Sequence, residues 1–133
     1  MANTRNSSVF QIRYHLVLVT KYRRSVLSGE MRGRLKTIFS ELLRAWRCEL
    51  IEFGGEDDHV HLLIETHPAL DLSRLVNNLK TVSSRRIRKE YSEHVARYYW
   101  KPFFWHGAYY IGSVGGATLD TVKRYVESQG KRL

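Results

Sequence analysis

The sequence predicts an α+β fold in which helices pack on one face of an antiparallel sheet. Four segments are rich in β-branched and aromatic residues, and they alternate with segments whose apolar residues recur every three or four positions. Their order is strand, helix, strand, strand, helix, strand, helix, which is typical of a ferredoxin-like arrangement. A chain of 133 residues can build one hydrophobic core, so we expect a single domain over residues 1–133.

The first half of the chain supplies three of these strands and one helix. Val9 to Thr20 predicts a strand, because β-branched and aromatic residues dominate it. Ser28 is a suitable N-cap for a helix that ends near Arg47, with apolar positions at Met31, Leu35, Ile38, Phe39, Leu42 and Trp46. Cys48 to Gly54 and His59 to Thr66 predict two strands, and the glycine- and aspartate-rich turn between them favours a hairpin.

The second half supplies the remaining elements. Asp71 can cap a long helix with inward residues Leu72, Leu75, Val76, Leu79 and Val82, and with most of its cations outside: Lys80, Arg85, Arg86, Arg88 and Lys89. The aromatic-rich segment 98–111 leads into a fourth strand around Tyr109 to Val114. Ala117 to Gly130 predicts a short amphipathic helix with Thr118 as its N-cap and an apolar stripe of Leu119, Val122 and Val126.

Positive charge is distributed unevenly along the chain. The formal net charge is +9; residues 13–47 carry nine basic and two acidic groups, and residues 71–101 carry eight and three. Residues 48–70 hold six acidic groups and no lysine or arginine. Solvated helix faces would account for the positive segments alone, but an acidic island in a basic protein also favours phosphate-backbone binding together with local cation binding.

Cysteine content and hydropathy exclude several other classes. Cys48 is the only cysteine, so an intramolecular disulfide and a cysteine zinc cluster are impossible. No apolar stretch reaches the length of a membrane span, and the N-terminus has no apolar core of a signal peptide. We therefore expect a cytoplasmic protein without a membrane partner, associated with the nucleoid.

The acidic island contains His59-Val60-His61, two histidines one residue apart on a predicted strand. Side chains alternate across a strand, so both imidazoles project from one face while Val60, Leu62 and Ile64 turn towards the core. Neutral imidazole is the commonest metal ligand, so the pair predicts a divalent-metal site. A pair of surface histidines on a half-exposed strand is the alternative.

Tyr125 and Gln129 lie four residues apart on the last predicted helix and therefore on one face of it. Their face borders the apolar stripe, next to Thr118 and Thr121. Tyrosine can act as a covalent nucleophile, and a glutamine carbonyl oxygen can be a third ligand to a hard metal. The alternative is a boundary tyrosine whose ring packs and whose hydroxyl meets water.

Five blocks of the sequence together resemble the single-tyrosine HUH transposases of small bacterial and archaeal insertion sequences, named for His-hydrophobic-His. The blocks are Tyr14 to Arg24, Asp58 to Leu63, Leu79 to Arg86, Trp105 with Tyr110 to Gly115, and Thr121 to Gln129. Two loops depart from the family pattern: Asp57 stands where the family often has proline, and His106-Gly107 replaces a short Asn- or Ser-Pro segment.

The resemblance implies a DNA transposase that cuts and rejoins single-stranded DNA at the ends of an insertion sequence. Tyr125 would attack a phosphodiester to leave a 5′-phosphotyrosine link and a free 3′-OH, and Mg²⁺ or Mn²⁺ would be held by His59, His61 and Gln129. Asp58 or Glu56 could replace a ligand. The resemblance also implies DNA hairpins as partners, and a homodimer in which the C-terminal helix carries its nucleophilic tyrosine to the other chain.

The basic blocks suggest where DNA binds. Candidate contacts are Arg13, Lys21, Tyr22, Arg23, Arg24, Lys80, Arg85 and Arg86, with Tyr22 as the preferred stacking residue and Trp100 and Trp105 as further aromatic candidates. Three other functions stay open at this point: a domesticated nickase specific for hairpins, a non-catalytic module that binds single strands or hairpins, and a metal phosphodiesterase that uses water as its nucleophile.

Overall fold

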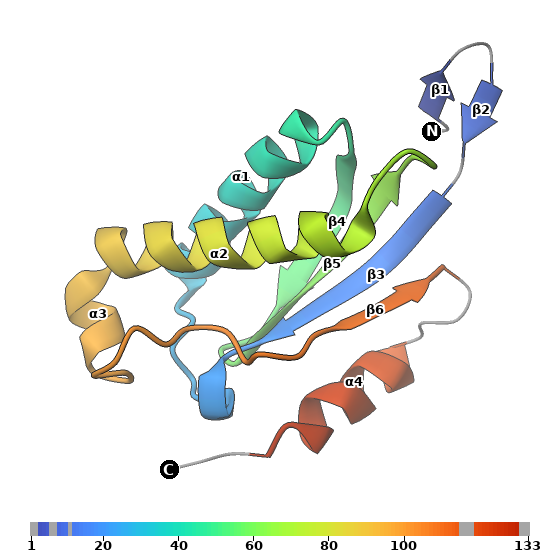
Figure 1. Ribbon diagram of the computed structural model, residues 1–133. Helices are drawn as coiled ribbons and strands as arrows, with labels where there is room; N and C mark the ends of the chain where they lie inside the picture. Colours follow the sequence, from blue (N-terminus) through green and yellow to red (C-terminus); the bar gives the residue numbers. More distant parts are fainter. Residues whose placement is uncertain (1–2, 6–7, 11, 115–118, 131–133) are drawn as a thin grey trace.

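The computed structural model describes residues 3–5, 8–10, 12–114 and 119–130 (Figure 1). Its elements are β1 (Asn3–Arg5), β2 (Ser8–Phe10), β3 (Ile12–Val19), the 3₁₀ turn η1 (Lys21–Arg23), α1 (Gly29–Ala45), β4 (Glu49–Gly55), β5 (His59–Thr66), α2 (Leu72–Glu90), α3 (Ser92–Ala96), β6 (Tyr110–Ser113) and α4 (Leu119–Ser128). None of the helices among these residues has the length and apolar character needed to cross a membrane.

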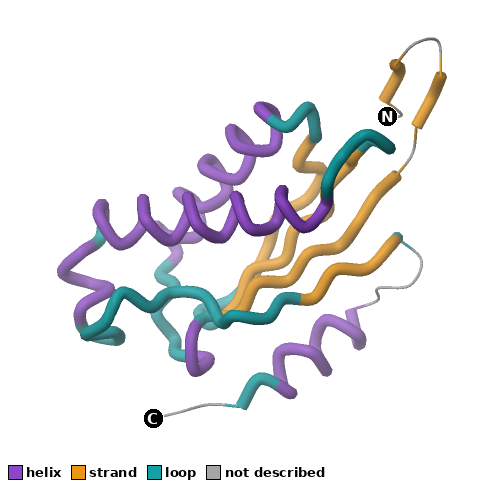
Figure 2. Tube along the Cα trace, in the orientation of Figure 1, coloured by secondary structure: helices purple, strands orange, loops and turns teal. Residues whose placement is uncertain are grey.

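The strands, orange in Figure 2, include four that form the main sheet. Their order is β4-β5-β3-β6, and every neighbouring pair is antiparallel. Because β3 and β4 both run antiparallel to β5, they point the same way, and α1 makes the crossover between them. This topology confirms the ferredoxin-like α+β prediction. The single strand expected over 9–20 is instead two strands, of which β2 pairs with β1 in a separate hairpin.

Helices α1 and α2 cover one face of the sheet and enclose the larger core. The predicted caps form: Ser28 Oγ accepts from the Met31 N–H at 3.2 Å, and an Asp71 carboxylate oxygen accepts from the Arg74 N–H at 3.2 Å. One residue of α2 that was predicted to face the core does not do so. Val82 is only partly buried, and the buried residue is Ser83, whose hydroxyl accepts a hydrogen bond from the indole of Trp105.

Helix α4 lies on the opposite face of the sheet from α1 and α2 (Figure 1). Val122 and Val126 pack against Val17 and Val19 of β3 and form a second, smaller core. The resemblance implied a helix detached from its own sheet, whereas this α4 docks on its own chain because its apolar stripe meets those valines. The expected N-cap Thr118 lies outside the described residues.

Candidate functional site

Strand β5 places both histidines on the face of the sheet that α4 covers. His59 pairs with Val19 and His61 with Val17, the two valines beneath α4. The imidazole centroids are 6.5 Å apart, with 29° between the ring planes. Val60, Leu62 and Ile64 are fully buried in the other core, as the alternation of the strand predicted.

Two glycines at the end of β4 make room for this arrangement. Gly54 pairs with His61, and a Cβ at Gly54 would lie 2.7 Å from Nε2 of that imidazole. A Cβ at Gly55 would collide with the backbone carbonyl of His59. The β4–β5 turn then closes through a hydrogen bond from the Glu56 N–H to the His59 carbonyl at 3.0 Å. The His61 ring therefore occupies space that only a glycine at position 54 leaves free.

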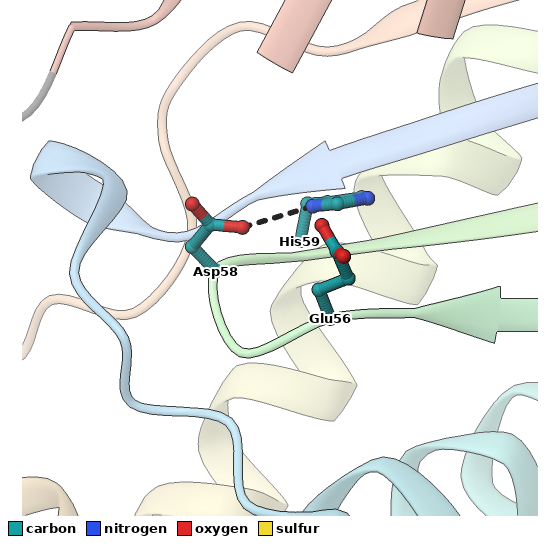
Figure 3. A group of neighbouring side chains, drawn as sticks. All are labelled: Glu56, Asp58 and His59. Atoms are coloured by element: carbon teal, nitrogen blue, oxygen red, sulfur yellow. Dashed lines mark hydrogen bonds and ion pairs between the residues drawn. The ribbon is translucent and has the colours of Figure 1, made fainter. Parts of the chain in front are cut away.

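Asp58 lies beside His59 and orients its ring (Figure 3). Nδ1 of His59 is 2.9 Å from Oδ1 of Asp58, and both side chains are about nine-tenths buried. The other carboxylate oxygen forms an ion pair with Nε of Arg23 at 3.2 Å. An ionised carboxylate only accepts hydrogen bonds, so this contact favours the neutral tautomer that has its proton on Nδ1 and its lone pair on Nε2, the form that a metal needs.

Glu56 adds a second carboxylate. One ligand atom from each of Glu56, Asp58 and His59 lies within 4.8 Å of the other two, and Figure 3 shows the Glu56 carboxylate next to the His59 ring. His61 is suited to the same task. Burial lowers the pKa of His61, the fields of His59 and His15 lower it further, and Glu52 opposes them. A lowered pKa favours the neutral imidazole that binds metals.

These groups line a cleft of about 430 Å³ between β5 and α4. The lining residues are Arg23, Gly55, Glu56, Asp58, His59, His61, Val122, Lys123, Val126 and Glu127. The four from α4 were not among the predicted site residues, although the helical spacing that placed Val122 and Val126 on one face could have suggested them. Lys123 and Glu127 bring one positive and one negative side chain to the cleft.

Tyr125 and Gln129 do not line this cleft. The Tyr125 ring packs against Tyr110 with centroids 5.8 Å apart, and its hydroxyl is buried without a hydrogen-bond partner. Burial raises the pKa of Tyr125. The Gln129 side-chain amide donates to the Ser128 hydroxyl at 3.1 Å. In this position of α4, the predicted nucleophile and third ligand are thus separated from the histidines.

Arg23 connects the histidine cleft to the end of α4. Besides its ion pair with Asp58, its guanidinium Nη1 donates to the carbonyls of Val126 at 3.3 Å and Glu127 at 3.5 Å. Cations are favourable at a helix C-terminus, where carbonyls lack helical partners. The side chain reaches the cleft because Tyr22 and Arg23 adopt left-handed φ angles of 60° and 53°.

Arg13 and Lys80, which are also predicted DNA contacts, have partners within the fold. Arg13 lies directly opposite Glu65 on β5, and the two form an ion pair at 3.1 Å in which the glutamate side chain is 1% exposed. Lys80 Nζ donates to the carbonyls of His106 and Gly107 at 2.9 and 2.8 Å. Burial lowers the pKa of Lys80, and the charge of Lys21 lowers it further. Both cations therefore stabilise the fold locally.

The α2 cations beyond Lys80 are more accessible. Arg85 is exposed, and Arg86 makes only a long 3.7 Å contact with Glu41. A shallow groove of about 360 Å³ lies beside them, lined by Lys80, Thr81, Ser84, Arg85, Arg88 and Trp105. This face of α2 keeps the charge and the accessibility that phosphate contacts need.

The comparisons with known proteins agree with this fold. A family model described as "Transposase IS200 like" matches residues 8–129. The chain belongs to this family. The match includes β5 with both histidines and α4 with Tyr125, and membership in a transposase family implies DNA transesterase activity.

Two curated relatives in the same family match nearly the whole chain. The ISDra2 transposase TnpA of Deinococcus radiodurans is 34% identical over 121 residues, covering 91% of this chain and 86% of the relative. The transposase for insertion sequence element IS200 of Salmonella typhimurium is 29% identical over 129 residues, covering 97% and 81%.

Solved structures share the architecture. A candidate transposase from Deinococcus radiodurans superposes with a TM-score of 0.87 at 30% identity, covering 99% of this chain and all of that one. A REP-associated tyrosine transposase bound to a REP hairpin has a TM-score of 0.59 at 12% identity, covering 96% and 69%, and at that identity it shows the fold alone.

Proposed function

We propose that this transposase cuts and rejoins single-stranded DNA through a covalent link between Tyr125 and a 5′-phosphate. The phenolic oxygen would form a bond to phosphorus while the bond from phosphorus to the 3′ oxygen breaks. The tyrosine loses its proton and the 3′ oxygen gains one. Because one phosphoester bond replaces another, the energy for rejoining is kept in the link, and no nucleotide cofactor is needed.

The observation that carries this proposal is the pair of imidazoles on one face of β5, with Asp58 behind His59. The fixed tautomer of His59 and the lowered pKa of His61 both favour the metal-binding form. Mg²⁺ and Mn²⁺ also take carboxylate oxygen, which Glu56 supplies in the same cleft. The residues thus fit a hard divalent ion, which would draw charge from the oxygens of the scissile phosphate.

The third ligand depends on the position of α4. With α4 docked as described, Glu56 is the available oxygen donor beside His59. Gln129 would replace or join it only when a C-terminal helix enters the cleft in another orientation. The separation of Tyr125 from the histidines supports a homodimer in which the α4 helix of one chain completes the site of the other.

DNA hairpins are the proposed recognition element. The structural relative bound to a REP hairpin shares the fold, and the exposed Arg85 and the partly buried Arg86 give this chain a basic face on α2. Single-stranded DNA next to the hairpin would then supply the phosphodiester to be cut. We propose that residues 1–133 form a single catalytic domain.

The test is an adduct assay with labelled single-stranded DNA taken from both flanks of the gene. The protein is incubated with this DNA and Mn²⁺, and a denaturing gel then separates free DNA from a protein–DNA adduct. We expect an adduct with the wild type and none with Tyr125→Phe or in excess EDTA. Tyr110→Phe removes the hydroxyl of the neighbouring ring and is the matched control, which should retain the adduct.

Each contrary outcome selects another function. Cleavage by the Tyr125→Phe variant would indicate a water nucleophile. Hairpin binding without any cleavage by the wild type would indicate a binding module. Adduct formation only at repeated hairpins distant from the gene would indicate a domesticated nickase.

A further inference from the structure

Trp100 is exposed on the surface, although residues close to it in the sequence are buried. The indole is 85% exposed, whereas the neighbouring Tyr99 is 4% exposed and Phe104 is 2% exposed. The Tyr99 hydroxyl donates to the backbone carbonyl of Lys21 at 2.6 Å. Buried aromatic residues on both sides thus hold the backbone while the largest side chain of the segment faces water.

Cations from two distant parts of the sequence surround this segment. Lys101 Nζ lies 5.0 Å from the centre of the Trp100 ring, and Arg97 and Lys101 are both exposed. From the η1 region, the Arg24 guanidinium lies 5.5 Å from the Tyr99 ring centre and donates to the Tyr98 carbonyl. Lys21 Nζ lies 5.3 Å from the ring centre of Phe103. We define the Trp100 patch as Lys21, Arg24, Arg97, Trp100 and Lys101.

The Trp100 patch borders the histidine cleft through η1. The left-handed turn at Tyr22 and Arg23 directs the Arg23 side chain to Asp58 in the cleft. Its sequence neighbours Lys21 and Arg24 contact the aromatic rings of segment 97–103 instead. One short turn of backbone therefore separates the two surfaces.

We propose that the Trp100 patch binds the unpaired DNA adjacent to the cleaved phosphodiester, with one base stacked on Trp100. This inference rests on the proposed function, which supplies the single-stranded substrate. Lys101 approaches one face of the indole, so the base takes the other, and Arg97 and Lys101 contact the flanking phosphates. Any base can stack on an aromatic ring, and cations contact the DNA backbone whatever its sequence. The patch therefore contributes affinity without sequence preference.

The charges favour DNA over a protein partner. Protein interfaces are depleted of lysine at their centres, whereas Lys101 lies against this tryptophan and Lys21 lies against Phe103 of the same segment. Glu93 is the only carboxylate of residues 91–104. A basic rim around one exposed aromatic ring is the arrangement that single-stranded nucleic acid requires.

The experiment measures binding of three fluorescent probes by anisotropy: a short single-stranded oligothymidine, an abasic strand of equal length, and a blunt duplex. The variants are Trp100→Ala, Trp100→Phe and the control Val114→Ala, which shortens another exposed hydrophobic side chain. We expect Trp100→Ala to weaken oligothymidine binding about tenfold. Trp100→Phe should retain most of the affinity, and Val114→Ala all of it.

The abasic strand should bind the wild type and Trp100→Ala with equal affinity, and so should the duplex. Unchanged oligothymidine affinity in Trp100→Ala, or an equal loss with the abasic strand, would overturn the proposal. A changed sedimentation coefficient with unchanged DNA affinity would mark the patch as a protein interface and overturn it too. Failure of the Tyr125 adduct assay would contradict the proposed function and leave this binding result intact, so the two failures are distinguishable.

Discussion

The side chains of Asp58 and His59, neighbours in the sequence, hydrogen bond to each other across 2.9 Å at the start of β5. The contact fixes the proton on Nδ1 of the histidine and leaves Nε2 as its free lone pair. The carboxylate is held in turn by Arg23. The orientation of the first proposed ligand therefore depends on a residue that does not need to touch the metal.

We predict that Asp58→Asn lowers Mn²⁺ affinity about 10- to 100-fold, because an amide neither fixes the tautomer nor raises the basicity of the imidazole. Isothermal titration with Mn²⁺ measures this. Asp57→Asn is the matched control, since Asp57 is the adjacent, exposed aspartate, and it should bind Mn²⁺ like the wild type. Equal affinities for both variants would show that the Asp58 contact is irrelevant to the metal.

Gly54→Ala should weaken Mn²⁺ binding while the protein stays folded. A Cβ at Gly54 would lie 2.7 Å from Nε2 of His61, so the imidazole must move from its position beside His59. Gly33→Ala on α1 has open space around the new Cβ, and should stabilise the protein by about 0.5–1 kcal/mol without changing metal affinity. Thermal unfolding and Mn²⁺ titration of both variants check the pair of expectations.

Arg13→Ala should destabilise the fold by about 2 kcal/mol, because Glu65 would lose its ion-pair partner in a buried position. Arg34→Ala breaks the more exposed pair with Glu90 and should cost less than about 1 kcal/mol. Urea unfolding measures both values. The Arg13→Ala variant could instead be as stable as the wild type and show a weaker salt dependence of DNA binding. That outcome would support Arg13 as the phosphate contact expected from the sequence.

The double variant Arg85→Ala, Arg86→Ala should flatten the salt dependence of hairpin binding. Each phosphate contact releases counterions and contributes about 0.9 to the slope of log affinity against log salt concentration. Loss of two contacts therefore reduces the slope by about 2. Titrations of a labelled hairpin at several NaCl concentrations measure it. An unaltered slope would place the DNA on another face than α2.

Subunit mixing tests whether active sites are shared. His61→Ala and Tyr125→Phe proteins are each expected to be inactive, and after exchange a mixed dimer with shared sites has one intact site, so cleavage returns. If each active site is built from one chain, every site in a mixed dimer lacks either His61 or the Tyr125 hydroxyl, so the dimer stays inactive. Persistent inactivity in dimers shown to have exchanged would contradict sharing.

The sequence predicted those features that depend on residues close together in the chain. The alternation of side chains along β5 correctly placed His59 and His61 on one face of the sheet and Val60 and Leu62 on the other. The capping residues correctly located the starts of α1 and α2. These signals are local, because strand alternation and helix caps involve residues within a few positions of each other.

The missed features depend on contacts between distant segments. The ion pair of Arg13, a predicted phosphate contact, was missed because its partner Glu65 lies 52 residues away and becomes its neighbour only through the β3–β5 register. The amphipathic pattern of α4 predicted an apolar stripe but not which sheet face it meets. The position of α4 on this face places Lys123 and Glu127 in the cleft and Tyr125 against Tyr110.

The valine contacts between α4 and β3 have a consequence for assembly. Val122 and Val126 would meet the same Val17 and Val19 if two copies traded these helices, so the buried apolar surface would be equal in both forms. Such an exchange is close to balanced in contact energy, and mass action then sets the outcome. If such an exchange occurs, low protein concentration would favour the monomer with α4 on its own sheet, and a high local concentration of copies on one DNA molecule would favour the exchanged dimer.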